Sequence, residues 1–568
     1  MRRVGFCSAR MTFLPIVERE LRVASRRRST YLGRLAGALV AMGIGGWIML
    51  AMHANAPGEM GLVLFVALSV MLCLYSLGAG ARITSDCLSE EKREGTLGLL
   101  FLTDLKGYDI VSGKLVANSL NIFYGLLSAF PVLAISLLMG GVTSGEFWRV
   151  SLTATNLLFL SLAVGMFASA VCRDERKSTS LAFLILLLVL AATPLVELGF
   201  NIANRSRNGS TGWLVFSPAF AAFAAFTPRI GLKQHDYWIA TLLTQAYGWT
   251  FLMLASVIVP RSWQDKAVRA PLAFRTIWRR VFGVNESTET VRRTRLLNVN
   301  PFLWLAGRDP LKITFLWIVL SLLTVLWIWG YLTWPSDWKN FPNYIMAAGL
   351  LHTLLKFWLA SEACYRFVQD RRTGALELLL STPLSIKEIL RGQRLALFRQ
   401  FAGPALYILG IDLIFLYFGL KDRDLGSHNL WIMIWFAGMT VFVMDLFALS
   451  WVSMWVGLSS RKVNRASGAA ISRILVLPWM FFLLSLTILG ALTFLAHINW
   501  NEDYVLLYWF GLCVANNLIF IAWAKRNLHQ RFRDLATQRF DVKTKRFAWR
   551  KSASNTPATD LPPVINLR

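Results

Sequence analysis

The chain has 568 residues, of which 55% are hydrophobic and only 16% are charged, and its mean hydropathy is positive. This composition is too apolar for a water-soluble protein of this length. The net charge of +27 would suit a nucleic-acid-binding protein only if Lys and Arg gathered on one folded face, but here they alternate with apolar runs. The composition therefore predicts a membrane protein and no nucleic-acid partner.

Apolar stretches long enough to cross a lipid bilayer as helices, which takes about 20 residues, recur along the whole chain. In the first half they are residues 31–52, 60–81, 115–139, 150–172, 178–198 and 237–259. In the second half they are residues 311–331, 344–364, 401–420, 430–458, 474–496 and 504–524. We predict an all-α polytopic membrane protein with about twelve transmembrane helices.

The distribution of positive charge predicts the orientation. With an even number of spans both termini lie on one side, and most of the 59 Lys and Arg residues fall in the loops and termini of that side. In membrane proteins the cytoplasmic loops carry an excess of Lys and Arg. We therefore expect a multi-pass protein of the cell (inner) membrane with both termini cytoplasmic.

No pattern for catalysis or metal binding is present in the sequence. The six cysteines are dispersed, and all lie in predicted spans or on the predicted cytoplasmic side, where thiols stay reduced. The sequence contains neither a CxxC pair nor an HExxH pair. We predict no catalytic residue and no metal site.

Two loops of the predicted cytoplasmic side repeat each other. Glu91–Leu105 aligns without a gap on Asp370–Leu384, and both segments lie between the second and third spans of their half. The alignment pairs Gly95 with Gly374, which leucine richness alone would not do. A weaker echo aligns residues 173–179 with residues 461–467. Because an even number of spans precedes the second copy, we expect two parallel six-helix repeats.

This repeat divides the chain into four parts. We predict a first half at residues 1–260, a basic cytoplasmic linker at 261–300, a second half at 301–524, and a cytoplasmic tail at 525–568 that is disordered at its end. Before the first span, apolar residues recur at helical spacing from Leu14 to Ala24. This segment is either a helix on the inner membrane face or an ordinary basic flank that fixes topology.

At the two loops the sequence resembles the permeases of the type-2 ABC exporter class. The first cytoplasmic loop of those proteins runs from a charged cluster into Gly-Thr-Leu-Glu, two leucines and a Ser/Thr-Pro-Leu-Ser end. The second copy matches except for Ala375 at the threonine position. The first copy has Gly98 for the glutamate and Asp104 for the proline. Such permeases usually have six spans and work in pairs, so this chain looks like a fused pair.

The resemblance implies that each loop forms a short coupling helix that docks on a cytoplasmic ATP-binding subunit, which we expect in two copies. The predicted partner-binding residues are the charged, turn-forming and apolar residues of both loops, namely Glu91, Arg93, Glu94, Gly95, Thr96, Leu97, Leu100, Arg371, Arg372, Gly374, Leu376, Glu377, Leu379 and Pro383. The apolar side chains of this set must be buried against another surface, which is either the partner subunit or the chain's own helix ends.

The chain itself lacks a phosphate-binding loop. The nearest candidate, Gly107–Leu115, has one residue too many before Gly113-Lys114, and Leu115 stands where a magnesium-binding hydroxyl is required. We therefore expect a transport subunit that is not itself an enzyme. ATP and magnesium would bind to the partner subunit, and this chain would hold no cofactor.

The first half also contains an apolar segment, Trp213–Pro228, that is too short to cross the membrane and is interrupted by proline. It resembles the re-entrant hairpin that caps the outer side of type-2 permeases. The alternative is an amphipathic segment that rests on the membrane surface.

The predicted spans of the second half contain ionisable residues, among them His352, Lys356, Asp412 and Asp445. Placing such residues inside a membrane costs free energy, and those that occur there are often functional. A proton-coupled secondary transporter is therefore the alternative function. A structural ion pair between Lys356 and Asp445 is the simpler interpretation, because their depths are similar. A membrane scaffold or sensor is a third class, but the chain has no large domain outside the membrane.

Overall fold

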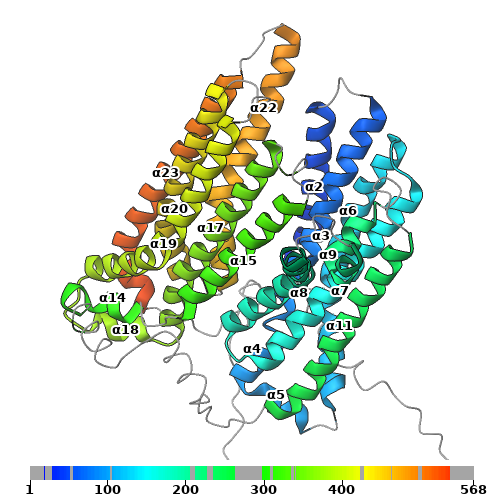
Figure 1. Ribbon diagram of the computed structural model, residues 1–568. Coiled ribbons are helices and arrows are strands. Elements are labelled where there is room, and N and C mark those ends of the chain that lie inside the picture. Colours follow the sequence, from blue (N-terminus) through cyan, green and yellow to red (C-terminus); the bar gives the residue numbers. More distant parts are fainter. Residues whose placement is uncertain are drawn as a thin grey trace, which may run out of the picture. The chain divides into compact units, whose positions relative to one another are not determined.

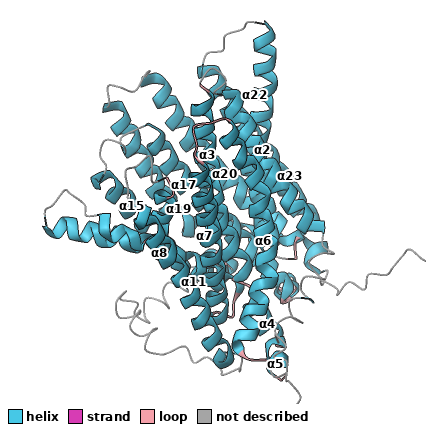
Figure 2. Cartoon of the chain, turned by 90° about the vertical axis from the view of Figure 1, so that its right-hand side faces the viewer, coloured by secondary structure: helices cyan, strands magenta, loops and turns pink. Residues whose placement is uncertain are grey.

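The computed structural model describes residues 18, 28–51, 56–102, 105–204, 211–226, 234–262, 294, 297–306, 311–333, 338, 341–421, 428–461, 463–496 and 502–537. Within these residues the regular structure is helical throughout (Figure 2). Eleven helices are long and apolar enough to cross a membrane, and α2 (Arg28–Ala51) adds a shorter apolar stretch at Gly37–Gly46. The prediction of an all-α polytopic membrane protein is confirmed.

The chain folds as two compact units. Unit 1 comprises Met1–Gly283 and Ile318–Lys339, and unit 2 comprises Val284–Trp317 and Asn340–Arg568. The division falls within helix α15 (Leu311–Thr333), which the sequence assigns entirely to the second half. The side chain of Trp329, in the later part of α15, packs against the hydrophobic core of unit 1.

Unit 1 is built around helix α7, which packs against α3, α6, α8 and α11. Besides α2, the described elements of unit 1 are α3 (Pro57–Thr84), α4 (Cys87–Glu94), α5 (Thr96–Phe101), α6 (Gly107–Leu138), α7 (Ser144–Val171), α8 (Glu175–Asn204), η1 (Thr211–Phe216), α9 (Pro218–Ala224) and α11 (Gln234–Ser262). A methyl group at Gly80 would lie 1.9 Å from the Ser161 hydroxyl oxygen, and one at Gly165 would lie 2.1 Å from that of Thr84. Small residues thus let α3 and α7 approach closely, as is common in membranes.

The apolar segment before α11 forms the short helices η1 and α9, which pack against α8 and α11. Phe220, Ala221 and Ala224 are buried in the core of unit 1. The Ser217 hydroxyl caps α9 by accepting a hydrogen bond from Ala219 N at 3.2 Å. Neighbouring helices thus cover one side of the segment, while Trp213, Phe216 and Phe223 remain exposed. Both interpretations of the segment, a re-entrant hairpin and a surface segment, stay predictions.

Unit 2 is built around helix α20, which packs against α17, α19, α21 and α23. Its described elements are α14 (Pro301–Ala306), the first turns of α15, α17 (Phe341–Arg372), α18 (Ala375–Leu380), α19 (Ile386–Lys421), α20 (His428–Ser459), α21 (Val463–Ile471), the π-helical turn η2 (Ser472–Val476), α22 (Leu477–Ala496) and α23 (Glu502–Thr537). Gly457 of α20 lies against Cys364 of α17, where a methyl group would come within 2.8 Å of the Cys364 carbonyl oxygen.

Several helices extend beyond the apolar stretches that predicted them. Helix α6 begins at Gly107 and α19 begins at Ile386, well before the predicted spans at residues 115 and 401. Helix α23 continues to Thr537, and its added turns bury Leu528 and Phe532. Residues 525–537 of the predicted tail are therefore helical. The tail beyond 537, the segment Leu14–Ala24 apart from residue 18, and most of the predicted linker lie outside the described residues.

Candidate functional site: two loops and a set of buried charges

Both repeated loops turn at their glycine. Gly95 ends α4 and precedes α5 with φ 73° and ψ 4°, and Gly374 follows α17 and precedes α18 with φ 76° and ψ 4°. Positive φ is unfavourable for residues with a Cβ atom, and glycine adopts it freely. Nothing lies within 4 Å of a Cβ at either glycine, so the left-handed turn, not close packing, requires the glycine. Figure 1 shows α4 and α5 at one end of unit 1, and α18 at one end of unit 2.

The helices that follow the two glycines match residue by residue. Helix α5 (Thr96–Phe101) and helix α18 (Ala375–Leu380) occupy the same positions in the alignment. Each buries its second residue, because Leu97 is 1% exposed and Leu376 is 0% exposed. Two residues later, Leu99 and Leu378 are 62% and 72% exposed. The chain's own helices therefore cover one leucine of each loop and leave another at the surface.

The next helix of each half begins with equivalent caps. In unit 1, Lys106 N donates to the Asp109 carboxylate at 3.1 Å at the start of α6. In unit 2, Ser385 N donates to the Glu388 carboxylate at 2.7 Å at the start of α19. The Ser385 hydroxyl adds a second bond to Glu388 at 2.9 Å, and these bonds lower the pKa of the Glu388 carboxyl. Carboxylates at this position satisfy free backbone N–H groups, so both loops end at a fixed residue.

A buried cation attaches each loop to its bundle. Lys92 of α4 donates to the carbonyl oxygen of Ala170 in the last turn of α7. Arg371 of α17 donates to the carbonyl oxygen of Leu458 at 2.7 Å in the last turn of α20. A cation at a helix C-terminus satisfies unpaired carbonyls and suits the helix dipole. Lys92 lies beyond α3, in the predicted cytoplasmic loop, and burial lowers its pKa to about 8.

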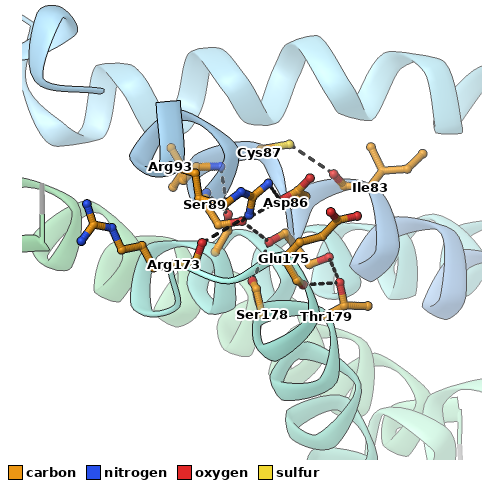
Figure 3. A network of polar contacts seen from close by, with 12 residues as sticks. Ile83, Asp86, Cys87, Ser89, Arg93, Arg173, Glu175, Ser178 and Thr179 are labelled. Atoms are coloured by element: carbon orange, nitrogen blue, oxygen red, sulfur yellow. Dashed lines mark hydrogen bonds and ion pairs between the residues drawn. The ribbon is translucent and has the colours of Figure 1, made fainter. Parts of the chain in front are cut away.

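The charged residues of the first loop are largely engaged within unit 1. Glu91 pairs with Lys114 at 2.7 Å. Arg93 pairs with Asp86 at 2.8 Å and donates to the Arg173 carbonyl oxygen at 3.2 Å. Figure 3 shows Arg93 between Asp86 and Arg173. Nearby, the Ser85 carbonyl oxygen accepts a hydrogen bond from the Ser178 hydroxyl. The network connects the loop between α3 and α4 to the loop between α7 and α8.

The predicted partner-binding residues thus divide into two groups. Those engaged or buried within their own unit are Glu91, Arg93, Leu97, Arg371 and Leu376. Those exposed at the surface are Glu94, Gly95, Thr96, Arg372 and Pro383, and those partly buried are Leu100, Gly374, Glu377 and Leu379. The predicted set omits the exposed Leu99, Leu102 and Leu378, although the alignment of Leu99 with Leu378 would have found two of them.

The buried charges of unit 2 form two pairs. Lys356 Nζ lies 2.7 Å from Asp445 Oδ2, as predicted, and Asn517 donates to the other Asp445 oxygen at 2.6 Å. His352 Nε2 lies 2.8 Å from Asp412 Oδ2, a pairing that the sequence did not predict. The Phe442 ring stacks on His352 at 4.1 Å and faces Lys356 at 5.7 Å. Both pairs therefore share one aromatic neighbour.

His352, Lys356 and Asp445 line a cavity of about 880 Å³ within unit 2, whereas Asp412 does not. The rest of its lining is mainly apolar and aromatic and includes Trp435, Trp479 and Trp509. The π-helical turn η2 also borders the cavity, and such turns are frequent at functional sites. Glu362 of α17 is a further buried acid that the sequence analysis missed. The cavity has the size of a small-molecule site.

The described residues contain no group of three His, Cys, Asp or Glu side chains placed to hold a metal ion. No protein-family model matches the sequence, and no curated protein matches it.

Proposed function

We propose that this chain is the membrane-spanning permease subunit of an ATP-driven transporter of the ABC type, with two six-helix halves fused in one polypeptide. The proposal places the chain in the cell membrane with both termini in the cytoplasm. A separate ATP-binding subunit, present in two copies, would hydrolyse ATP with magnesium. The direction is export, which follows only from the resemblance to type-2 exporters.

One observation carries the proposal, namely the same turn at aligned positions in both loops. A left-handed glycine, a buried leucine two residues later and an exposed leucine two residues after that recur in each unit. An exposed leucine costs free energy in water, because about 25 cal/mol is lost per Å² of apolar surface left uncovered. Paired apolar surfaces on short, anchored helices fit a partner that must move both halves together.

The test is co-purification of the candidate ATP-binding subunit with variants of the exposed leucines. Leu99→Ser and Leu378→Ser should reduce co-purification and ATP-dependent transport without changing the thermal stability of the chain. Leu138→Ser is the matched control, because Leu138 is 88% exposed at the far end of α6. Full partner binding by the double variant Leu99→Ser/Leu378→Ser would refute the docking assignment.

A proton-coupled secondary transporter is the second candidate, and the buried charge pairs favour it. His352 and Lys356 both border the cavity, and each is paired with a carboxylate. Transport assays in proteoliposomes separate the two functions. Uptake driven by a proton gradient without any ATP-binding subunit would support the secondary transporter, whereas uptake that requires the subunit and ATP would support the permease.

A further inference from the structure

A second cavity of unit 2, of about 560 Å³, lies between α17, α19 and α20. One end of its lining is basic, with Arg391 and Arg394, and the rest is apolar apart from Ser450. Such a volume is sufficient for a ligand of moderate size. The cavity is separate from the one that holds the charge pairs, because the two share no lining residue.

The lining residues form one stripe along α19. Arg391, Leu395, Phe398, Ala402, Ala405 and Leu409 follow one another at intervals of three or four residues and all line the cavity. This spacing places them on a single face of a helix. At 1.5 Å per residue the stripe extends over about 27 Å, from the polar end of α19 into the predicted membrane span. Together with Arg394, which also lines the cavity, the stripe joins two cations to an elongated apolar surface.

The two guanidinium groups are available for a ligand. Neither Arg391 nor Arg394 forms an ion pair with any residue that the structure describes. Arg394 lies over the Trp451 ring of α20 at 4.5 Å, which holds its side chain beside the cavity. Guanidinium groups bind phosphate oxygens in fixed, often bidentate geometry. The charge at this end of the cavity thus suits a phosphate group.

We propose that this groove binds one anionic glycerophospholipid from the leaflet at the α18 end of unit 2. Its phosphate would lie between Arg391 and Arg394, and one acyl chain would lie along Phe398, Ala402 and Ala405. The positive-inside rule predicts that this leaflet is the cytoplasmic one, where anionic lipids attract basic residues. A phosphatidylcholine would bind less well, because its trimethylammonium group would stand beside two cations. The proposal is independent of the coupling mechanism.

Native mass spectrometry of the delipidated full-length chain, titrated with phosphatidylglycerol or phosphatidylcholine, tests the site. We expect one phosphatidylglycerol to bind with at least about tenfold preference, since the two guanidinium contacts are charge-assisted. Arg391→Gln/Arg394→Gln should remove this preference. Lys387→Gln, an exposed cation in the first turn of the same helix, should leave it unchanged.

Ala405→Trp provides a second test that keeps both arginines, because an indole would fill the apolar part of the groove. It should weaken phosphatidylglycerol binding about tenfold even if the double arginine variant fails to fold. Equal binding of both lipids, unchanged in the arginine variant and in Ala405→Trp, would overturn the proposal. Displacement of the lipid by glycerol 3-phosphate alone would also overturn it, because the site would then bind a soluble anion.

Discussion

The two loops reach the same turn by different routes. In unit 1 the chain leaves α3 at Ser85, and the Ser169 hydroxyl accepts hydrogen bonds from Leu88 N at 2.8 Å and Ser89 N at 2.9 Å, which caps the start of α4. In unit 2, α17 runs without a break to Arg372. When the weaker echo is extended toward the N-terminus, Gly457 stands opposite Ser169. A glycine offers no hydroxyl to cap a new helix, but it lets α17 pass close to α20.

This comparison teaches which features the turn requires. The break between α3 and α4 is dispensable, whereas the left-handed glycine, the buried leucine and the cation on the neighbouring helix end occur in both units. The units differ more strongly within the membrane. When the loop alignment is extended toward the N-terminus, Leu77 stands opposite Lys356, and when the weaker echo is extended in the same way, Leu157 stands opposite Asp445. Unit 1 thus has leucines where unit 2 has an ion pair.

The largest expected effect follows from breaking that ion pair. Lys356→Leu or Asp445→Leu alone should cost about 3 kcal/mol, because each strands a buried charge. The double variant reproduces the residues of unit 1 and should recover most of the folded yield, with Asn517 losing its acceptor. Fluorescence-detected size-exclusion chromatography measures the yield. Folded single variants that lose only proton-driven transport would instead support a proton relay.

The second effect concerns the leucines on the two short helices. Leu97→Ala and Leu376→Ala should each lower stability by about 2 kcal/mol, because both side chains are almost fully buried. Leu99→Ala and Leu378→Ala should change stability by less than about 0.5 kcal/mol, because they are exposed. Thermal unfolding in detergent compares the four variants. Equal destabilisation of buried and exposed positions would mean that the loops pack differently.

The third effect concerns the glycine turns. Gly95→Val and Gly374→Val should each cost about 1–2 kcal/mol, since valine at positive φ is strained. Membrane insertion should be normal, while co-purification of the ATP-binding subunit and transport should fall. We expect Gly374→Val to be more damaging, because the second loop keeps the glutamate and proline of the exporter pattern.

The control for the glycine variants is Gly98→Ala, which lies within helix α5. Alanine is compatible with a helical backbone, so this variant should behave as the parent protein. Gly95→Asn and Gly374→Asn should retain more partner binding and transport than the Val variants, because asparagine tolerates the left-handed region. Normal partner binding and transport by both Val variants would contradict the coupling role.

The smallest effect is the pH dependence of the Lys92 contact. The pKa of Lys92 is lowered in the folded chain from 10.5 to about 8, so the unfolded chain binds more protons between these values. The stability contributed by this residue should therefore rise with pH from about 8 to 10.5. Thermal unfolding measures this effect. Between pH 7 and pH 9.5, the stability of the parent protein should increase relative to that of Lys92→Met. Arg371→Met is the control, because arginine stays protonated over this range.

Much of the fold could be predicted from the sequence because the bilayer imposes a strong length requirement. An apolar run of about 20 residues has few alternatives to a membrane-crossing helix. Helix ends were predicted less well. The first turns of α19 and the last turns of α23 are polar on one face, so their helicity depends on the Ser385–Glu388 cap and on packing of Phe532 against Phe367.

Parts of the candidate site could also be predicted from local sequence signals. The turn at Gly95 and Gly374 could be inferred, because glycine at a change from charged to apolar sequence signals a local backbone requirement. The Lys356–Asp445 pair could be inferred because the two residues lie at similar depths in their predicted spans. The His352–Asp412 pair and the role of Asn517 could not, because they depend on how α17, α19, α20 and α23 are rotated about their axes.

The sequence by itself determined that this protein is helical and crosses a membrane many times, and it located two aligned loops. These properties follow from local composition and spacing, which act within one helix or one turn. Only the tertiary structure decided which leucine of each loop is buried, which helix end Lys92 and Arg371 hold, and which face of α19 borders a groove. Those outcomes depend on the rotation and close approach of neighbouring helices, which residues such as Gly80, Gly165 and Gly457 permit.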